Sequence, residues 1–179
     1  AVRDRQQMAV LHIADSLAAR PLLRGDRILD VGTGAGFPGL PLAIAEPGRR
    51  FDLIDSNNKK IQFVQHAAGL LGLDNVTAVK ARAEDYAPGY RFDTVIARAL
   101  ASLPKLLEMA GHHVREDGVF VALKGRHPEQ ELEQVPETWQ CNVRELTVPG
   151  LEAGSRHAVL MKRVQEPASP EGGPSRRAE

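Results

Sequence analysis

The stretch Ile28-Leu29-Asp30-Val31-Gly32-Thr33-Gly34-Ala35-Gly36-Phe37-Pro38-Gly39 decides the fold. Its apolar start predicts a buried strand over residues 27–31, and its glycine cluster predicts a turn that opens a helix. Glycine tolerates positive φ in such a turn and lets a ligand approach the backbone, while the helix start presents free N–H groups. The stretch therefore predicts a nucleotide-type cradle at the carboxyl end of a first strand.

Short apolar strands alternate with helical segments along the following sequence. We expect further strands over 50–54, 76–79, 94–96 and 119–123, and helices over 59–71, 103–114 and, more weakly, 129–135. This alternation predicts right-handed βαβ units and a parallel sheet. Two last strands, near 143–148 and 157–162, lack a helix between them and should pair antiparallel at the sheet edge. The predicted fold class is α/β, a doubly wound Rossmann-like domain with a seven-stranded, mostly parallel sheet and an antiparallel last strand.

The chain divides into three parts by composition and pattern. A helix over residues 8–17, which Pro21 should end, forms an N-terminal helical segment over residues 1–24. The α/β domain covers residues 25–164. Residues 165–179 are rich in Pro, Gly and Ser and predict a disordered tail. Because the chain begins with Ala1 in polar sequence, we also expect a truncated or processed start.

Composition limits the class of protein. The 179 residues are 42% hydrophobic, which suits one globular domain with a sizeable core. No apolar run approaches the ~20 residues that a membrane span needs. The single cysteine, Cys141, excludes an intramolecular disulfide and a thiolate-rich metal site, and it favours a reducing, cytoplasmic setting. The 23 basic and 23 acidic residues balance, which by itself argues against a nucleic-acid partner.

Acidic residues after the glycine cluster favour one class of ligand. Asp55 ends the second strand, ~20 residues after the cluster, where a carboxylate can accept hydrogen bonds from both ribose hydroxyls. Glu84 follows the third strand, where an adenine edge would lie. Phe37 stands where a dinucleotide fingerprint requires glycine, and Asp30 would repel a pyrophosphate but suits a cation. The pattern therefore favours S-adenosylmethionine, a cationic methyl donor without phosphate, over NAD.

The methyl acceptor should lie near the end of the fourth strand. No Asn/Asp-Pro-Pro-aromatic turn is present for methylation of an exocyclic amine, and no lysine-centred base set for a ribose hydroxyl can be assembled. Cys141 lies too late in the chain to act on a pyrimidine carbon in the expected pocket. Guanine N7 has a lone pair and no proton to remove, so positioning and electrostatics can suffice. The sequence is compatible with N7 chemistry, but this step does not by itself exclude other acceptors.

Basic residues are expected to gather at this edge of the sheet. Arg82, Arg98 and Lys124 lie at predicted carboxyl ends of strands, which converge on one crevice in a parallel sheet. We expect the acids Glu129, Glu131 and Glu133 to lie elsewhere, on a solvated face. Overall neutrality then hides a local basic surface and does not exclude RNA.

At these residues the chain resembles the small-subunit (16S) ribosomal RNA guanine-N7 methyltransferase G family, also called glucose-inhibited division protein B. The resemblance runs from about Ala1 to Arg163 and rests on these pieces: Val2-Arg3-Asp4, His12 with Asp15-Ser16-Leu17, the glycine stretch extended to Leu40-Pro41-Leu42, Asp55-Ser56, Arg82-Ala83-Glu84, Ala97-Arg98-Ala99, Ala101-Ser102-Leu103, Ala122-Leu123-Lys124-Gly125 and Arg156-His157. The chain departs from the family at Leu11, at Asn57-Asn58 and in lacking a further N-terminal helical segment.

Membership implies N7 methylation of one guanosine in 16S ribosomal RNA, with S-adenosylmethionine as donor and the small ribosomal subunit as substrate. The family's donor-binding residues fall on Gly32, Phe37, Ala83, Glu84 and Arg98, to which the glycine-turn argument adds Gly34 and Gly36 and the ribose argument Asp55. The matching basic positions Arg82, Lys124 and Arg156 are expected against RNA, with Arg98, Lys124 and Arg156 positioning the guanosine. We expect no general base, no metal, no membrane and a monomer. The alternatives are methylation of a small molecule or protein, or an NAD-dependent oxidoreductase.

Overall fold

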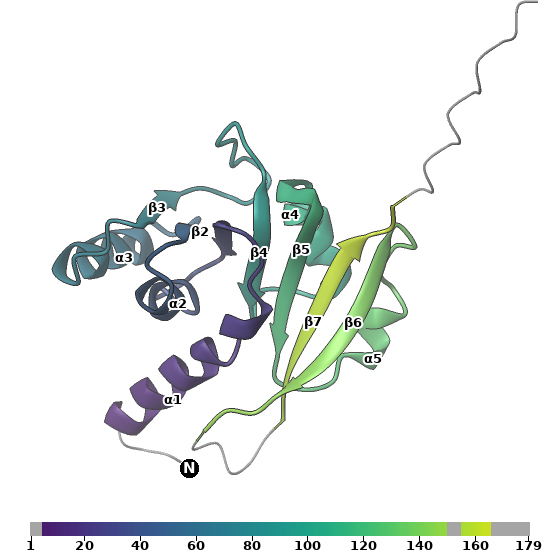
Figure 1. Cartoon of the computed structure of the whole chain (residues 1–179), viewed down its shortest axis with the longest axis horizontal. Coiled ribbons are helices and arrows are strands. Elements are labelled where there is room, and N and C mark those ends of the chain that lie inside the picture. The colour runs from purple at the N-terminus through teal and green to yellow at the C-terminus, as the bar shows by residue number, and fades with distance from the viewer. Residues whose placement is uncertain (1–4, 150–154, 166–179) are drawn as a thin grey trace, which may run out of the picture.

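The computed structural model describes residues 5–149 and 155–165, with side chains from Val10 onward. A seven-stranded sheet in the order β3-β2-β1-β4-β5-β7-β6 forms its centre (Figure 1). The elements are α1 (Arg5–Leu17), the 3₁₀ helix η1 (Arg20–Leu22), β1 (Arg27–Val31), α2 (Gly39–Ala45), β2 (Arg50–Asp55), α3 (Asn58–Leu70), β3 (Val76–Lys80), β4 (Phe92–Arg98), α4 (Leu103–Ala110), the 3₁₀ helix η2 (Gly111–His113), β5 (Val114–Lys124), α5 (Glu129–Leu132), β6 (Trp139–Leu146) and β7 (Arg156–Arg163).

The predicted sheet topology is confirmed. Strands β1 to β5 pair in parallel, whereas β7 is antiparallel to both β5 and β6. The last strand does not form the edge, because it inserts between β5 and β6 and leaves β6 outermost. The expected tail lies outside the described residues from 166 onward.

Several predicted boundaries are wrong. Pro21 does not end the first helix: α1 stops at Leu17, and Pro21 lies inside η1. The helix expected up to residue 114 ends at Ala110, and β5 begins at Val114 rather than near residue 119. The polar stretch 115–117 continues this strand because its pairing with β4 extends to Phe92 and Val114 across a bulge.

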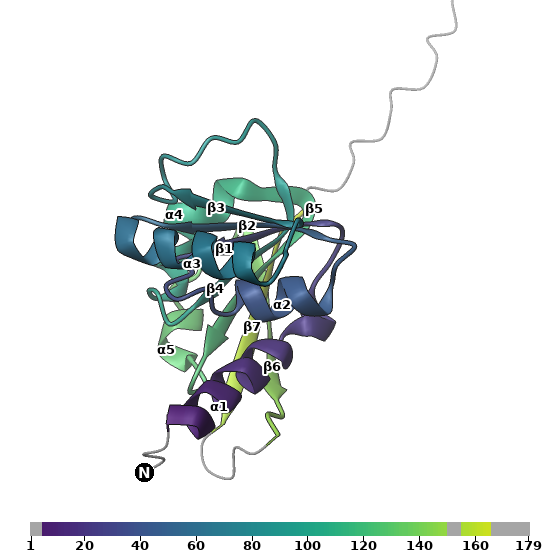
Figure 2. The same ribbon diagram turned by 90° about the vertical axis from the view of Figure 1, so that its left-hand side faces the viewer.

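Consecutive residues of each central strand point to opposite faces of the sheet and build two cores. On one face, Ile28 and Leu53 pack with Leu42 of α2 and Val64 of α3. On the other face, the neighbouring strand residues pack with Leu103 and Leu106 of α4; these include Leu29, Ile54 and Val95. Figure 2, turned from Figure 1, shows α2 and α3 in front of the strands, with α1 below them. The two-sided burial explains why the strands read as nearly continuous apolar runs.

No helix of the described part of the chain is long and apolar enough to cross a bilayer. Among the same residues, no group of three or more His, Cys, Asp and Glu side chains is arranged to hold a metal ion.

The turn between β1 and α2 depends on close packing beneath it. A Cβ atom added at Gly39 would lie 2.7 Å from Asp30 Oδ2 and 2.7 Å from Leu53 Cγ. In a dinucleotide fingerprint the glycine at the position of Phe37 permits close helix–strand packing; here Gly39, two residues later, permits it. The helix can approach the sheet only because this position lacks a side chain.

We expect Gly39→Ala to lower the free energy of unfolding by about 1–3 kcal/mol, the usual cost of overpacking a core. Gly48→Ala is the matched control, since an added Cβ there meets nothing within 4 Å. Urea unfolding followed by circular dichroism measures both variants. Equal stability of Gly39→Ala and the unchanged protein would show that the packing is not limiting.

Candidate functional site

The glycine turn lies at the carboxyl end of β1, as predicted. Gly32, Gly34 and Gly36 adopt positive φ angles of 67°, 60° and 89°, which residues with a Cβ atom rarely accept. The turn is tied to β2, because Thr33 N donates to Ile54 O at 3.0 Å and Gly34 N donates to Asp55 Oδ2 at 3.0 Å. The backbone of the turn is thus held in one shape by the neighbouring strand.

Asp55 lies at the end of β2 with 7% of its surface exposed. Besides Gly34 N, its carboxylate accepts a hydrogen bond from Asn57 N at 2.8 Å and lies 3.5 Å from Lys60 Nζ. A carboxylate offers about four lone-pair sites, so these contacts leave capacity for a further donor. Asp55 is therefore both a brace for the turn and an acceptor at the cleft beside it.

A cleft of about 360 Å³ opens beside the turn, and we call it the glycine-turn cleft; it is lined at Gly32, Asp55 and Arg98 and by residues 81–84. These strand ends bring together six predicted site residues, namely Gly32, Asp55, Arg82, Ala83, Glu84 and Arg98. Leu100 also lines the cleft and covers Gly32, since a Cβ added there would lie 2.8 Å from Leu100 Cδ1. The cleft is concave, partly apolar and edged by both charges.

A second cleft of about 360 Å³ lies between α1 and β7, and we call it the α1–β7 cleft. Its lining includes His12 and Asp15 of α1, Leu123 and Lys124 of β5, and Arg156 of β7. Arg98 and Ala99 line both clefts, so the end of β4 forms the partition between them. Ala99 has a φ of 49°, an uncommon conformation that clusters at functional sites.

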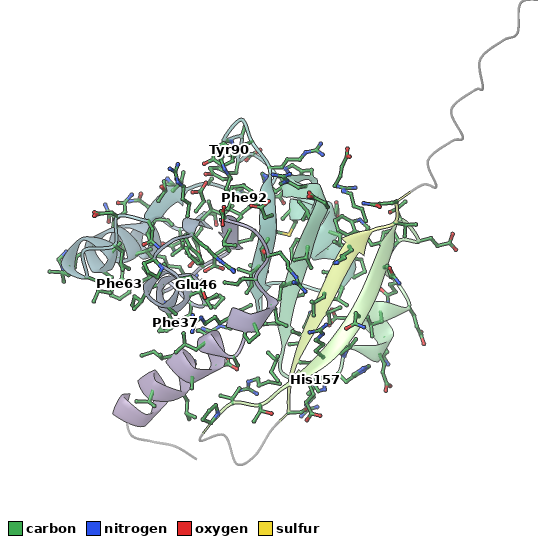
Figure 3. All side chains as sticks on the ribbon, viewed as in Figure 1. Phe37, Glu46, Phe63, Tyr90, Phe92 and His157 are labelled. Carbon is green, nitrogen blue, oxygen red and sulfur yellow. The ribbon has the colours of Figure 1, made fainter. Side chains whose placement is uncertain are left out.

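Phe37 lies near this partition. Its ring centroid is 5.3 Å from Arg98 Cζ and 5.7 Å from the ring centroid of His12. Figure 3 shows Phe37 and His157 toward one end of the sheet and Tyr90 and Phe92 toward the other. The carboxyl ends of the parallel strands and the two clefts therefore share one edge of the sheet.

The expected separation of basic and acidic residues is wrong. Asp15 Oδ1 accepts a hydrogen bond from Arg156 Nε at 3.0 Å, and Asp15 Oδ2 lies 3.4 Å from Arg98 Nη1. Lys124 Nζ donates to Glu131 Oε2 at 2.7 Å, although Glu131 was expected on a remote solvated face. These contacts bring acids from α1 and α5 to the cations at the strand ends. Local ion pairs, rather than distance, balance the charge.

Asp30 lies beneath the turn and is fully buried. Its Oδ2 accepts hydrogen bonds from Thr33 Oγ1 at 2.6 Å and Gly39 N at 2.9 Å, while Oδ1 has no partner among the described residues. Burial raises the pKa of this carboxyl from 3.8 to about 6, against the opposing effect of its hydrogen bonds. At neutral pH, Asp30 is largely a buried anion, which favours a cation rather than a phosphate above the turn.

His113 is a functional candidate that the sequence did not single out. The residue is 3% exposed, and its Nε2 lies 2.8 Å from Ala83 O, an atom that can only accept. Burial lowers the pKa of the ring, so the neutral form donates this hydrogen bond at pH 7. His113 thereby holds the backbone of the 81–84 segment from the far side. No local pattern around His112-His113 signals this contact.

A larger cavity of about 750 Å³ lies at the opposite edge of the sheet, at the amino ends of the strands. Asp52 lines it and accepts hydrogen bonds from Tyr86 Oη at 2.8 Å and Tyr90 Oη at 2.9 Å. Ligands of open α/β sheets bind at the carboxyl ends, so volume alone does not identify the site.

Comparison with known proteins gives a consistent family. The model of the family described as rRNA small subunit methyltransferase G matches residues 1–159. The "Ribosomal RNA small subunit methyltransferase G" of Aeromonas salmonicida is 50% identical over 169 residues, covering 92% of this chain and 79% of that protein. The protein of the same name from Idiomarina loihiensis is 50% identical over 163 residues, covering 90% of this chain and 79% of that protein.

Solved structures share the fold at low identity. A SAM-dependent methyltransferase from Aquifex aeolicus superposes with a TM-score of 0.64 at 20% identity, covering 88% of this chain and 93% of that chain. TrmN from Thermus thermophilus gives a TM-score of 0.63 at 20% identity, covering 88% and 48%. At this identity the likeness concerns the fold alone.

The buried carboxyl of Asp30 predicts a pH-dependent stability difference. Its pKa is raised, so between pH 4 and 6 the folded chain binds more protons than the unfolded chain, and this contribution to stability falls as pH rises. We expect the free energy of unfolding of the unchanged protein, relative to Asp30→Asn, to fall by roughly 3 kcal/mol from pH 4 to 7 and then level off. Urea unfolding at each pH measures the difference; a flat profile would contradict it.

Proposed function

This chain belongs to the ribosomal RNA small subunit methyltransferase G family, and on that premise we propose that it methylates N7 of one guanosine in 16S ribosomal RNA. The methyl donor is S-adenosylmethionine. The observation that carries the proposal is the pair of clefts divided by Arg98 and Ala99, one formed by the glycine turn and Asp55 and the other lined by cations. Two adjoining sites allow a donor and an acceptor nucleotide to meet at the end of β4.

The glycine-turn cleft suits the donor. When bound, S-adenosylmethionine supplies a methyl group activated by a positively charged sulfur. Asp55 accepts hydrogen bonds from the ribose, and Glu84 and the backbone at Ala83 hold the adenine side. The positive-φ turn lets the ligand approach the backbone. The unpartnered Oδ1 of Asp30, considered among the described residues, adds a negative potential that favours a cationic ligand.

The α1–β7 cleft suits the acceptor nucleotide. N7 of guanine carries a lone pair and no proton, so the residues need only align it with the donor and neutralise nearby phosphates. Arg98 lies at the partition, and Arg156 lines the acceptor side. Arg82 is exposed at the rim of the donor side, where it can meet an RNA phosphate. No residue is assigned as a general base in this scheme.

Ion pairing shapes the proposed contact with RNA. Lys124 donates to Ala101 O at 2.8 Å as well as to Glu131, so it must exchange one of these partners to touch a phosphate. With Arg98 and Arg156 also paired, we expect modest affinity for naked RNA and tighter binding to the shaped surface of the small ribosomal subunit. The enzyme acts as a monomer in the cytoplasm, without a metal ion, in this proposal.

We expect Asp55→Asn to weaken binding of S-adenosylhomocysteine by about 1–2 kcal/mol, or roughly 5- to 30-fold, because an amide cannot accept from both ribose hydroxyls. Asp52→Asn is the matched control, since Asp52 is 6% exposed on the same strand but faces the tyrosines at the opposite edge. Isothermal titration calorimetry measures both. Equal dissociation constants for the unchanged protein and Asp55→Asn would refute the assigned role.

The central experiment supplies S-adenosylmethionine with a tritiated methyl group and small subunits from a strain that lacks the activity. We expect label in 16S ribosomal RNA, recovered as 7-methylguanosine after digestion to nucleosides. Label only at another base position, or in protein or a small molecule, would overturn the assignment of the acceptor. Tight NADH binding with no response to S-adenosylhomocysteine would overturn the assignment of the donor.

A further inference from the structure

Asp15 is the single acidic residue among the described residues that line the α1–β7 cleft. The same lining contributes three cations, Arg98, Lys124 and Arg156, and two histidines. An acid is out of place in a site that only has to attract phosphates. Its presence needs either a structural reason or a ligand with hydrogen-bond donors.

The carboxylate retains capacity for a ligand. Its Oδ1 accepts from Arg156 Nε at 3.0 Å and its Oδ2 lies 3.4 Å from Arg98 Nη1, which uses one direction on each oxygen. About two of its four lone-pair sites stay open, and 16% of the side chain is exposed. The two guanidinium groups balance the charge and fix the orientation of the carboxylate. Asp15 is thus a preorganised acceptor.

Guanine is the base whose edge matches two adjacent acceptor oxygens. Its N1–H and exocyclic amine are neighbouring donors, whereas adenine presents an unprotonated N1 beside its amine. Single-stranded bases are read on such edges while their faces pack against side chains. Leu123 and Leu146 give the cleft apolar walls for the face of a base.

We propose that Asp15 reads the acceptor guanine, accepting hydrogen bonds from its N1–H and its exocyclic amine. The inference rests on the proposed function and adds the residue that selects the base. In this placement N7 lies across the ring from Asp15 and faces the partition at Ala99, which both clefts share. Selection of the base and presentation of N7 are one geometric event.

The same contact favours the reaction. Methylation forms a bond from the N7 lone pair to the methyl carbon as the carbon–sulfur bond breaks with its electron pair left on sulfur, so a positive charge moves onto the guanine. The N1–H and amine donors become more acidic as this charge develops, and their hydrogen bonds to a carboxylate strengthen. Asp15 therefore stabilises the transition state more than the bound substrate.

The test replaces the acceptor guanosine, once the labelled-methyl experiment has located it, by inosine in reconstituted small subunits. Inosine lacks only the exocyclic amine. We expect the unchanged protein to methylate guanosine at least tenfold faster than inosine. In Asp15→Asn we expect the rate on guanosine to fall and the guanosine-to-inosine ratio to drop below about threefold, because the amide no longer accepts from both donors.

Glu46→Gln is the matched control. Glu46 also joins two arginines, lying 2.5 Å from Arg20 Nε and 3.3 Å from Arg49 Nε, but it does not line the α1–β7 cleft. Its ratio should equal that of the unchanged protein. Binding of S-adenosylhomocysteine should be the same in Asp15→Asn, since Asp15 does not line the glycine-turn cleft.

The outcomes separate the two proposals. No methylation of guanosine by the unchanged protein would overturn the proposed function and this inference together. Equal rates on guanosine and inosine in the unchanged protein would overturn only the inference, and this comparison requires no variant. A wild-type ratio in Asp15→Asn would mean that Asp15 merely holds the arginines. A faster rate on guanosine in Asp15→Asn would mean that the ion pair blocks the cleft.

Discussion

The carboxylate of Asp30 holds together the part of the structure on which both clefts depend. From within β1 it accepts hydrogen bonds from Thr33 Oγ1, in the turn, and from Gly39 N, at the start of α2. These bonds join the strand, the glycine turn and the helix in one unit. Burial raises the pKa of Asp30 to about 6 and thus destabilises the charged group, a cost that accompanies a rigid turn. A change at Gly39 disturbs the turn through the same atoms.

The end of β4 then relates the rigid turn to the second cleft. Arg98 lines both cavities, and Ala99 follows it in a left-handed conformation that redirects the chain. Ion pairs from α1 hold Arg98 and Arg156, so the N-terminal helix takes part in the site rather than only covering the sheet. The described cations are balanced locally, which reconciles a neutral chain with a proposed RNA substrate.

Most of the fold was predictable because its signals are local. The strands at 27–31 and 50–54 were predicted within a residue, since buried parallel strands produce apolar runs that are bounded by turn residues. The start of β5 was missed because its polar residues 115–117 join the sheet only through the long-range pair of Val114 with Phe92. Among site residues, the motif placed Gly32, Asp55 and Glu84 at one cleft, whereas nothing near His113 indicated its contact with Ala83.

The sequence by itself determined the glycine turn, the alternation of strands and helices, and the family. Each depends on residue types at fixed short spacings, where backbone conformation and hydrophobic periodicity act directly. Only the tertiary structure decided which charges meet. Asp15 joins Arg98 and Arg156 across 83 and 141 residues of chain, and Lys124 turns to Glu131 rather than to an open cleft. Such partners are chosen by the packing of α1 and α5 against the strand ends, and the spacing of residues along the chain carries no record of that choice.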